Sequence, residues 1–415
     1  MADRVFIKAG RLLDGTGAPP REDVTVIVED GKIAAVERVL PDPVPEGAEI
    51  IDATDRTVLP GLVDSHVHLC FSGSADPLAD VLRETDEQLL LRAAANAQAA
   101  LVSGVTALRD CGSRGFLTLA LREAINAGTL VGPRLYAAGP PITTTAGHLH
   151  FCGLEVEGPE RLRRAVRDLH KERVDFVKIM VTGGYMTPRT NPFALQYTPE
   201  ELAAVVEDSH RLGHRVAGHI ASKDGIRAAV EAGLDTFEHC VWHEASAPGE
   251  YRYDEELGAA MAARGVIVGL TIGAGERRLA AAVATGEELP ANVRSRLEAL
   301  ARVHAQMRAQ GVRLAGHSDA GTVHCTFDGL AQSAAALVRL YGWSPMEAVV
   351  SMTRTAAEAT GIAAEVGTVE PGKAADLIVV EGDPRCEPEA LQRVDRVILK
   401  GRTVARRGQL MVGRS

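Results

Sequence analysis

The stretch PGLVDSHVHL, residues 60–69, places two histidines one residue apart in an otherwise apolar run. In an extended strand, Asp64, His66 and His68 face one side and the intervening residues face the other. Each imidazole carries a donor and an acceptor, so a buried strand face rarely holds two of them without partners. What lies opposite these two histidines therefore decides both the fold and the chemistry.

Size and composition indicate a globular enzyme. The chain has 415 residues, 46% hydrophobic and 24% charged, which is enough for one barrel-sized domain and a smaller one. A formal net charge of −10 argues against a nucleic-acid partner, because phosphate binding requires clustered Lys and Arg. Apolar runs are too short for a signal peptide or a membrane span, so we expect no membrane partner. Six cysteines without CxxC spacing indicate reduced thiols and a cytoplasmic protein.

Both ends of the chain are predicted to be rich in β-strands. Residues 1–59 alternate apolar and polar positions, with DG turn signals between the alternating runs. The segments KAADLIVVEG and VDRVILKGRTVARRG near the other end have the same pattern. We expect residues 1–59 and 364–415 to close one composite β-sandwich domain, into which residues 60–363 are inserted.

The middle of the chain alternates strands and helices, which predicts an α/β fold. The clearest helix follows Thr198, with Pro199 at its first position and Glu201 completing a capping box. Eight strands separated by helices are the count of a (β/α)8 TIM barrel, which we expect over residues 60–363. The eight predicted strands are 62–68, 105–112, 134–139, 175–183, 215–220, 235–240, 266–272 and 313–319.

Ionisable side chains occur on five of these strands, mostly at their ends. In a parallel barrel the carboxyl ends of the strands lie on one rim, where active sites are found. Imidazole and carboxylate groups there are suitable ligands for Zn²⁺ and similar divalent ions. We expect six side chains to meet at this rim: His66, His68, Lys178, His219, His239 and Asp319.

These motifs resemble those of the amidohydrolase superfamily over nearly the whole chain. LPGLVDSHVHL resembles its HxH signature, DFVKIMVTGG its strand with a carboxylated lysine, and AGHI, FEHC and GHSDAG its later ligand strands. VEPGKAADLIVV resembles its return to the composite sandwich. The loops TTTAGH and GGYMTPRTNP are similar to the branch of Xaa-Pro dipeptidases (prolidases), arginine and lysine carboxypeptidases and imidazolonepropionase-related proteins.

The resemblance implies a centre of two divalent metal ions, with zinc as the first expectation. A protonated lysine has no lone pair for a metal, whereas reaction of Lys178 with CO₂ would give N6-carboxylysine, an anion able to bridge two ions. Asp319 would be the catalytic residue: it would accept the proton of a metal-bound hydroxide and return it to the leaving nitrogen. The implied ligands are His66, His68 and Asp319 for the first ion, His219 and His239 for the second, and Lys178 as the bridge.

Substrate contacts are expected from the loops beyond the strands. The resemblance implies a small-molecule substrate whose carboxylate or carbonyl contacts His148, Tyr185 and Arg189, and a homo-oligomer as the assembly. Four other histidines are predicted to lie in solvent on helices or just beyond them: His170, His210, His214 and His304. The sequence leaves open the roles of three more: His150, His243 and His317.

Three functions are compatible with these residues. The first is hydrolysis of an amide C–N bond in a dipeptide or an N-acyl amino acid. The second is hydrolytic deamination, or opening of a cyclic amide, as in other branches of the superfamily. The third is a non-catalytic relative, which would have lost ligands that this chain retains. Lys178 favours the first, because deaminase branches commonly use one metal and need no bridge.

Overall fold

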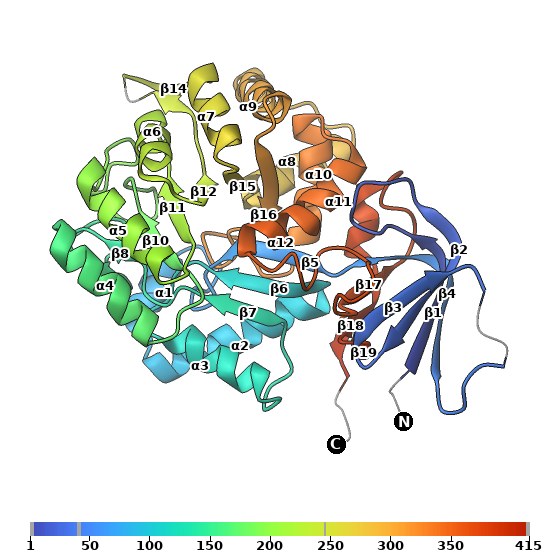
Figure 1. Cartoon of the computed structure of the whole chain (residues 1–415). Coiled ribbons are helices and arrows are strands. Elements are labelled where there is room, and N and C mark those ends of the chain that lie inside the picture. Colours follow the sequence, from blue (N-terminus) through green and yellow to red (C-terminus); the bar gives the residue numbers. More distant parts are fainter. Residues whose placement is uncertain (1–3, 40–42, 245, 412–415) are drawn as a thin grey trace.

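Both ends of the chain pair in one eight-stranded sheet. The computed structural model describes residues 4–39, 43–244 and 246–411. The strand order is β20-β19-β18-β17-β4-β1-β2-β3, so the antiparallel β17–β4 pair joins the two ends, which lie together as blue and red strands in Figure 1. The strands are β1 (Arg4–Leu12), β2 (Arg21–Glu29), β3 (Lys32–Glu37), β4 (Glu49–Pro60), β17 (Leu377–Val380), β18 (Val394–Leu399), β19 (Arg402–Arg406) and β20 (Gln409–Leu410).

This sheet has an apolar core of its own. Alternate residues of β1, among them Val5 and Ile7, are buried with Val26 and Val28 of β2 and with Leu377 of β17. The alternation follows from the period of two residues in a strand, which turns every second side chain to the same face. A β-rich part built from both ends is therefore confirmed, whereas its sandwich arrangement and the boundaries at residues 59 and 364 stay predictions.

Each of the eight strands expected in the middle of the chain is present and lies inside its predicted range. They pair in parallel as two sheets, β5-β6-β7 and β16-β15-β12-β11-β10-β8-β9. The eight strands are β5 (Leu62–Val67), β6 (Val105–Asp110), β7 (Arg134–Ala137), β10 (Val177–Met180), β11 (Val216–Ile220), β12 (Thr236–His239), β15 (Ile267–Thr271) and β16 (Arg313–His317). The short strands β8 (Ile142–Thr143) and β9 (Leu154–Glu155) extend the larger sheet, and β13 (His243–Glu244) pairs with β14 (Ala247–Tyr251).

Backbone hydrogen bonds just beyond the strands connect the two parallel sheets. The Asp319 amide donates to the His66 carbonyl at 3.1 Å, and the His68 amide donates to the Ala320 carbonyl at 2.8 Å. On the other side, the Asp175 amide donates to the Ala137 carbonyl at 3.0 Å. These bonds bring the end of β5 beside the end of β16. The α/β class with parallel strands is confirmed, and closure into an eight-stranded barrel stays a prediction.

Helices lie between most of the parallel strands (Figure 1). In α5 the expected capping box is present, since the Thr198 hydroxyl accepts from the Glu201 amide and the Glu201 carboxylate accepts from the Thr198 amide. The helices are α1 (Pro77–Arg83), α2 (Asp86–Val102), α3 (Leu117–Asn126), α4 (Pro159–Lys171), α5 (Pro199–Arg211), α6 (Lys223–Ala232), α7 (Glu255–Ala263), α8 (Ala274–Ala284), α9 (Ala291–Ala309), α10 (Leu330–Tyr341), α11 (Pro345–Ser351), α12 (Arg354–Thr360) and the 3₁₀ helix η1 (Pro388–Gln392).

Two expectations from composition can be compared with the structure. All six cysteines are free thiols, and five of them are buried. Within the described ranges, no helix combines the length and the apolar character needed to cross a bilayer.

The prediction that His304 lies in solvent is wrong. The side chain is only 7% exposed, because its helix α9 packs it against Tyr341 of α10, with ring centroids 4.9 Å apart. Burial, with the cation of Arg308 nearby, lowers the pKa of His304 to about 3. The sequence pattern correctly predicted that His304 lies on a helix. The prediction that it lies on the solvent-exposed face of that helix is wrong.

We expect His304 to make folding sensitive to acid. The folded-state pKa of about 3 lies below the unfolded value of 6.5, so the unfolded chain binds the proton more readily between these limits. The contribution to stability is complete above pH 6.5 and is lost as the pH falls toward 3. In His304→Phe, the loss of unfolding free energy between pH 6.5 and pH 4.5 should be smaller than in wild type by about 2 kcal/mol. Denaturant titrations at a series of pH values measure this difference, and parallel curves for the two proteins would contradict it.

Candidate active site

A single pocket of about 630 Å³ collects the predicted site residues at the carboxyl ends of the parallel strands. Arg189 is the exception, because it lies exposed in the loop after β10, with φ 67°, and is not among the residues that line the pocket. The predicted residues that do line it are His66, His68, His148, Lys178, Tyr185, His219, His239 and Asp319.

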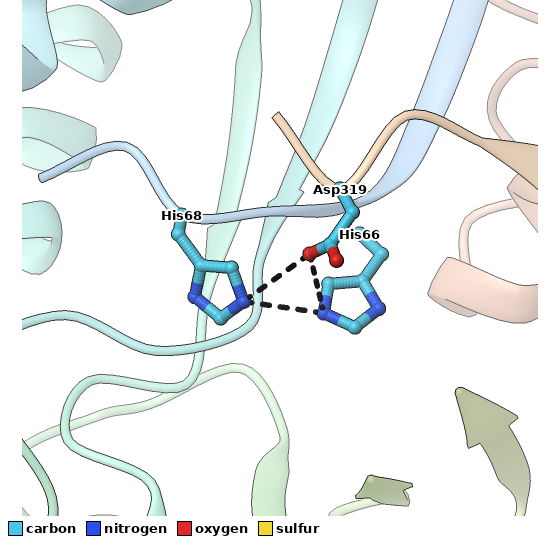
Figure 2. Close-up of side chains that lie close together, drawn as sticks. All are labelled: His66, His68 and Asp319. Carbon is cyan, nitrogen blue, oxygen red and sulfur yellow. Dashed lines mark hydrogen bonds and ion pairs between the residues drawn. The ribbon is translucent and has the colours of Figure 1, made fainter. Parts of the chain in front are cut away.

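His66, His68 and Asp319 form one compact group (Figure 2). The two Nε2 atoms are 3.3 Å apart, and each lies 3.5 Å from Asp319 Oδ1. The opposite ring nitrogens are occupied, since His66 Nδ1 lies 3.1 Å from a Glu238 oxygen and His68 Nδ1 lies 3.1 Å from the Gly112 carbonyl. Because a carbonyl and a carboxylate only accept, both Nδ1 atoms carry the hydrogen, and both Nε2 lone pairs face Asp319.

His219 and His239 form a second group beside the first. Their ring centroids are 4.5 Å apart, and His239 lies 5.1 Å from His66 by the same measure. His239 Nδ1 is 2.5 Å from the Thr271 hydroxyl, and His219 Nε2 is 3.2 Å from the Gly183 carbonyl. His239, the last residue of β12, adopts φ 65°, a left-handed backbone conformation at the point where the strand ends.

Lys178 of β10 ends among these histidines without a partner. Its side chain is 1% exposed, and its Nζ has no hydrogen-bond partner among the described residues. Burial lowers the pKa of Lys178, which favours the uncharged amine. A buried ammonium is costly unless it is paired, so this position requires either a neutral amine or a group added to it.

The electrostatics of the pocket favour metal ligation by the histidines. Burial lowers the pKa of His68 to about 4 and holds the pKa values of His66, His219 and His239 well below the ordinary value. These rings are therefore neutral near pH 7 and keep the lone pair that a metal requires. Burial also raises the pKa of Asp319 to about 6. The donor set of imidazoles and one carboxylate fits divalent ions such as Zn²⁺.

The loop residues expected to contact the substrate differ in how far they are exposed to solvent. His148 is 4% exposed, and Gly184 lies so close to its ring that a Cβ there would come within 2.4 Å of the imidazole. Tyr185 is 71% exposed at the same pocket. His243 also lines the pocket, with its ring 4.5 Å from that of Tyr251.

Glu238 was missed by the sequence reasoning, together with the residues that hold it. This carboxylate is fully buried behind His66 and accepts from Arg109 Nη2 at 2.6 Å. His317, whose role the sequence left open, places its Nε2 3.4 Å from the same carboxylate. A signal was present in the sequence, because the otherwise apolar segments DTFEHC and VTALRDCG carry Glu238 and Arg109, two residues of opposite charge.

The amidohydrolase family model matches residues 57–404, and the chain therefore belongs to the amidohydrolase family. This confirms the resemblance seen in the sequence. The chain is accordingly an enzyme, a hydrolase acting on C–N bonds, and the non-catalytic alternative is set aside.

Individual relatives cover most of the chain. Ochratoxinase from Aspergillus niger is 30% identical over 411 residues, covering 91% of this chain and 81% of that protein. Imidazolonepropionase from Mesorhizobium japonicum is 25% identical over 399 residues, covering 86% of each chain. Among solved structures, a Xaa-Pro dipeptidase with methionine bound in its active site superposes with a TM-score of 0.82 at 29% identity, covering 97% of this chain and 99% of that one.

Proposed function

We propose that this chain is a binuclear metal-dependent hydrolase that cleaves an amide C–N bond in a dipeptide or an N-acyl amino acid. The observation that carries the proposal is the buried, unpartnered Nζ of Lys178, at a pocket lined by His66, His219, His239 and Asp319. A structural lysine in such a place would have an anionic partner. A carboxylated lysine that bridges two cations accounts for the missing partner.

The residues at the pocket fit two divalent ions, with zinc as the first candidate. N6-carboxylysine at position 178 would contribute two oxygens between the two positions. When bound, the ions would polarise the substrate carbonyl and lower the pKa of a water molecule. The ligands would be His66, His68 and Asp319 at the first position and His219 and His239 at the second, within an eight-stranded barrel.

Asp319 is proposed as the catalytic residue. Its Oδ1 faces the two Nε2 atoms of His66 and His68, and therefore lies where the attacking water would be held. The carboxylate would accept the proton of that water and return it to the leaving nitrogen. An amide nitrogen is weakly basic and must be protonated before it can leave. His148 and Tyr185 would position the substrate, and the exposed Arg189 would act only on a substrate that reaches beyond the pocket.

The remaining wall of the pocket supports a substrate with an apolar side chain. Leu300, Val303 and Met307 of α9 line it together with Leu270 and Ile272. The charged residues at this wall, Glu276 and Arg296, lie 3.6 Å apart as an ion pair and offset each other. The methionine bound to the structurally similar Xaa-Pro dipeptidase agrees with this choice.

The second candidate function is the opening of a cyclic amide. The similarity to imidazolonepropionase over 86% of the chain favours it, whereas the buried Lys178 favours the two-metal amide hydrolase.

Metal analysis and a substrate panel test the proposal together. Protein loaded with Zn²⁺ or Mn²⁺ is dialysed, its bound metal is measured, and it is assayed with dipeptides, N-acyl amino acids, cyclic amides and amino-heterocycles. We expect about two equivalents of metal and release of free amino acid from the first two groups. About one equivalent with turnover only of cyclic amides, or with release of ammonia, would replace the proposal by the alternative. Sedimentation of the same sample tests the expected homo-oligomer.

A further inference from the structure

Glu238 lies at the centre of a buried polar network that reaches the site through His66. One oxygen, Oε2, is 3.1 Å from His66 Nδ1 and 3.4 Å from His317 Nε2. The other, Oε1, accepts from Arg109 Nη2 at 2.6 Å and from the Thr236 hydroxyl at 2.8 Å. These residues are at most 3% exposed.

Arg109 fixes the charge and the position of this carboxylate. The Arg109 guanidinium, which stays protonated in proteins, forms a buried ion pair with Glu238 at 2.6 Å. Arg109 is itself held in place: its Nε donates to the Ser65 carbonyl at 2.5 Å, its Nη1 donates to the Ala359 carbonyl at 3.2 Å, and its guanidinium lies over the Phe176 ring. Glu238 is therefore an anion that accepts from two sides.

The backbone leaves room for this arrangement at one glycine. A Cβ at Gly269 of β15 would come within 2.3 Å of His317 Nε2 and 2.6 Å of Glu238 Oε2. Any other residue there would displace both of these buried side chains.

We infer that Glu238, fixed by Arg109, is a positioning residue that sets the tautomer and the orientation of His66. An anionic acceptor at Nδ1 requires the hydrogen on that nitrogen, which leaves the Nε2 lone pair directed at His68 and Asp319. The inference rests on the proposed function, since it assigns Glu238 a role toward a metal held by His66. It goes beyond that function by naming a carboxylate that touches neither substrate nor metal.

The competing role for Glu238 is that of a metal ligand. Ligand atoms of Glu238, His66 and His317 lie within 4.8 Å of one another, so this group could hold a cation. The positioning role fits better, because Arg109 already neutralises the carboxylate at 2.6 Å and would repel a cation at the same place. The two roles differ in the number of metals bound, which can be measured.

The test compares metal binding by wild type, Glu238→Gln and the control Glu231→Gln, an exposed residue of α6. Zinc affinity is measured by competition with a chromogenic chelator, and the Co²⁺-loaded proteins are compared by their visible absorption. In Glu238→Gln we expect the same number of metals as in wild type, a 10–100-fold weaker affinity at one position and altered Co²⁺ bands. Glu231→Gln should match wild type in all three.

A second variant guards against a folding defect. Removing only the carboxylate leaves Arg109 buried and unpaired, so Glu238→Gln combined with Arg109→Gln removes both charges together. The double variant should show the same weakened position. Wild-type zinc affinity and wild-type Co²⁺ bands in either folded variant would overturn the inference. Loss of a whole metal equivalent would also overturn it, because Glu238 would then be a metal ligand. Failure of wild type itself to bind metal would instead count against the proposed function.

Discussion

Lys178→Ala is expected to lose one of the two metal equivalents and to reduce kcat/KM about 10³-fold or more. Metal stabilisation of charge in a transition state contributes several kcal/mol, and each 1.36 kcal/mol corresponds to a factor of ten. The variant removes the only lysine at the pocket, whose Nζ lies buried without a partner among the residues that the structure describes. Metal content and steady-state rates on the substrate identified by the panel measure both effects.

Chemical rescue makes the expectation specific to a carbamate. Shortening Lys178 to alanine leaves a cavity in which a small carboxylic acid such as acetate can replace the carbamate oxygens. Added acetate should restore part of the activity and the second metal equivalent. Lys171→Ala, at the exposed end of α4, is the matched control. It should retain wild-type rates, and added acetate should not change them. A Lys178→Ala enzyme with wild-type rates would exclude the bridging role.

Asp319→Asn is expected to lower kcat by about 10²–10⁴-fold, the usual contribution of a positioned acid–base group. Asparagine keeps the shape of the side chain but accepts no proton at its oxygen near neutral pH. Asp328→Asn, an exposed residue further along the same segment, should leave the rate unchanged. A rate near that of wild type for Asp319→Asn would contradict the assigned proton transfer.

The same variant should also change the pH profile. Burial raises the pKa of Asp319 to about 6, and a protonated carboxyl cannot act as a base. Wild-type kcat/KM should therefore fall as the pH falls through this pKa, and a bound cation, which favours the anion, places the acidic limb at or below about pH 6. The residual activity of Asp319→Asn should lack this limb.

Local patterns in the sequence were sufficient for much of the fold. The eight predicted strands of the middle region were recognisable because buried parallel strands are short apolar runs, bounded by helices with recognisable caps such as Thr198. The short strands β8, β9, β13 and β14 were not predicted. The two histidines at the end of β5 were recognisable because their spacing places both on one face. The carboxyl ends of parallel strands lie at one edge of a sheet, so residues as distant in sequence as His66 and Asp319 could be predicted to meet there. The structure places these two side chains close together.

Other features depend on contacts that no local pattern contains. Glu238 and Arg109 are 129 positions apart and lie on strands of different sheets, β12 and β6, so they meet only when the two sheets come together in the folded chain. Whether His304 faces solvent depends on α10 packing against α9, which the helical period alone does not specify. Arg189 adopts a left-handed backbone conformation in its loop and lies exposed, outside the set of residues that line the pocket. Strand pairing, helix packing and loop geometry are tertiary properties. The sequence-based predictions failed at Glu238, His304 and Arg189 because these residues depend on such properties.

The β4–β17 pair has a consequence for how the chain is made. Val58 of β4 lies opposite Val379, more than three hundred residues further along the polypeptide. During synthesis the first strands leave the ribosome long before their neighbour exists, so the edge of β4 stays open while the catalytic segment forms. The last forty residues thus complete the first sixty, and a nascent chain halted before Leu377 would present an unfinished, aggregation-prone edge to the chaperones of the cell.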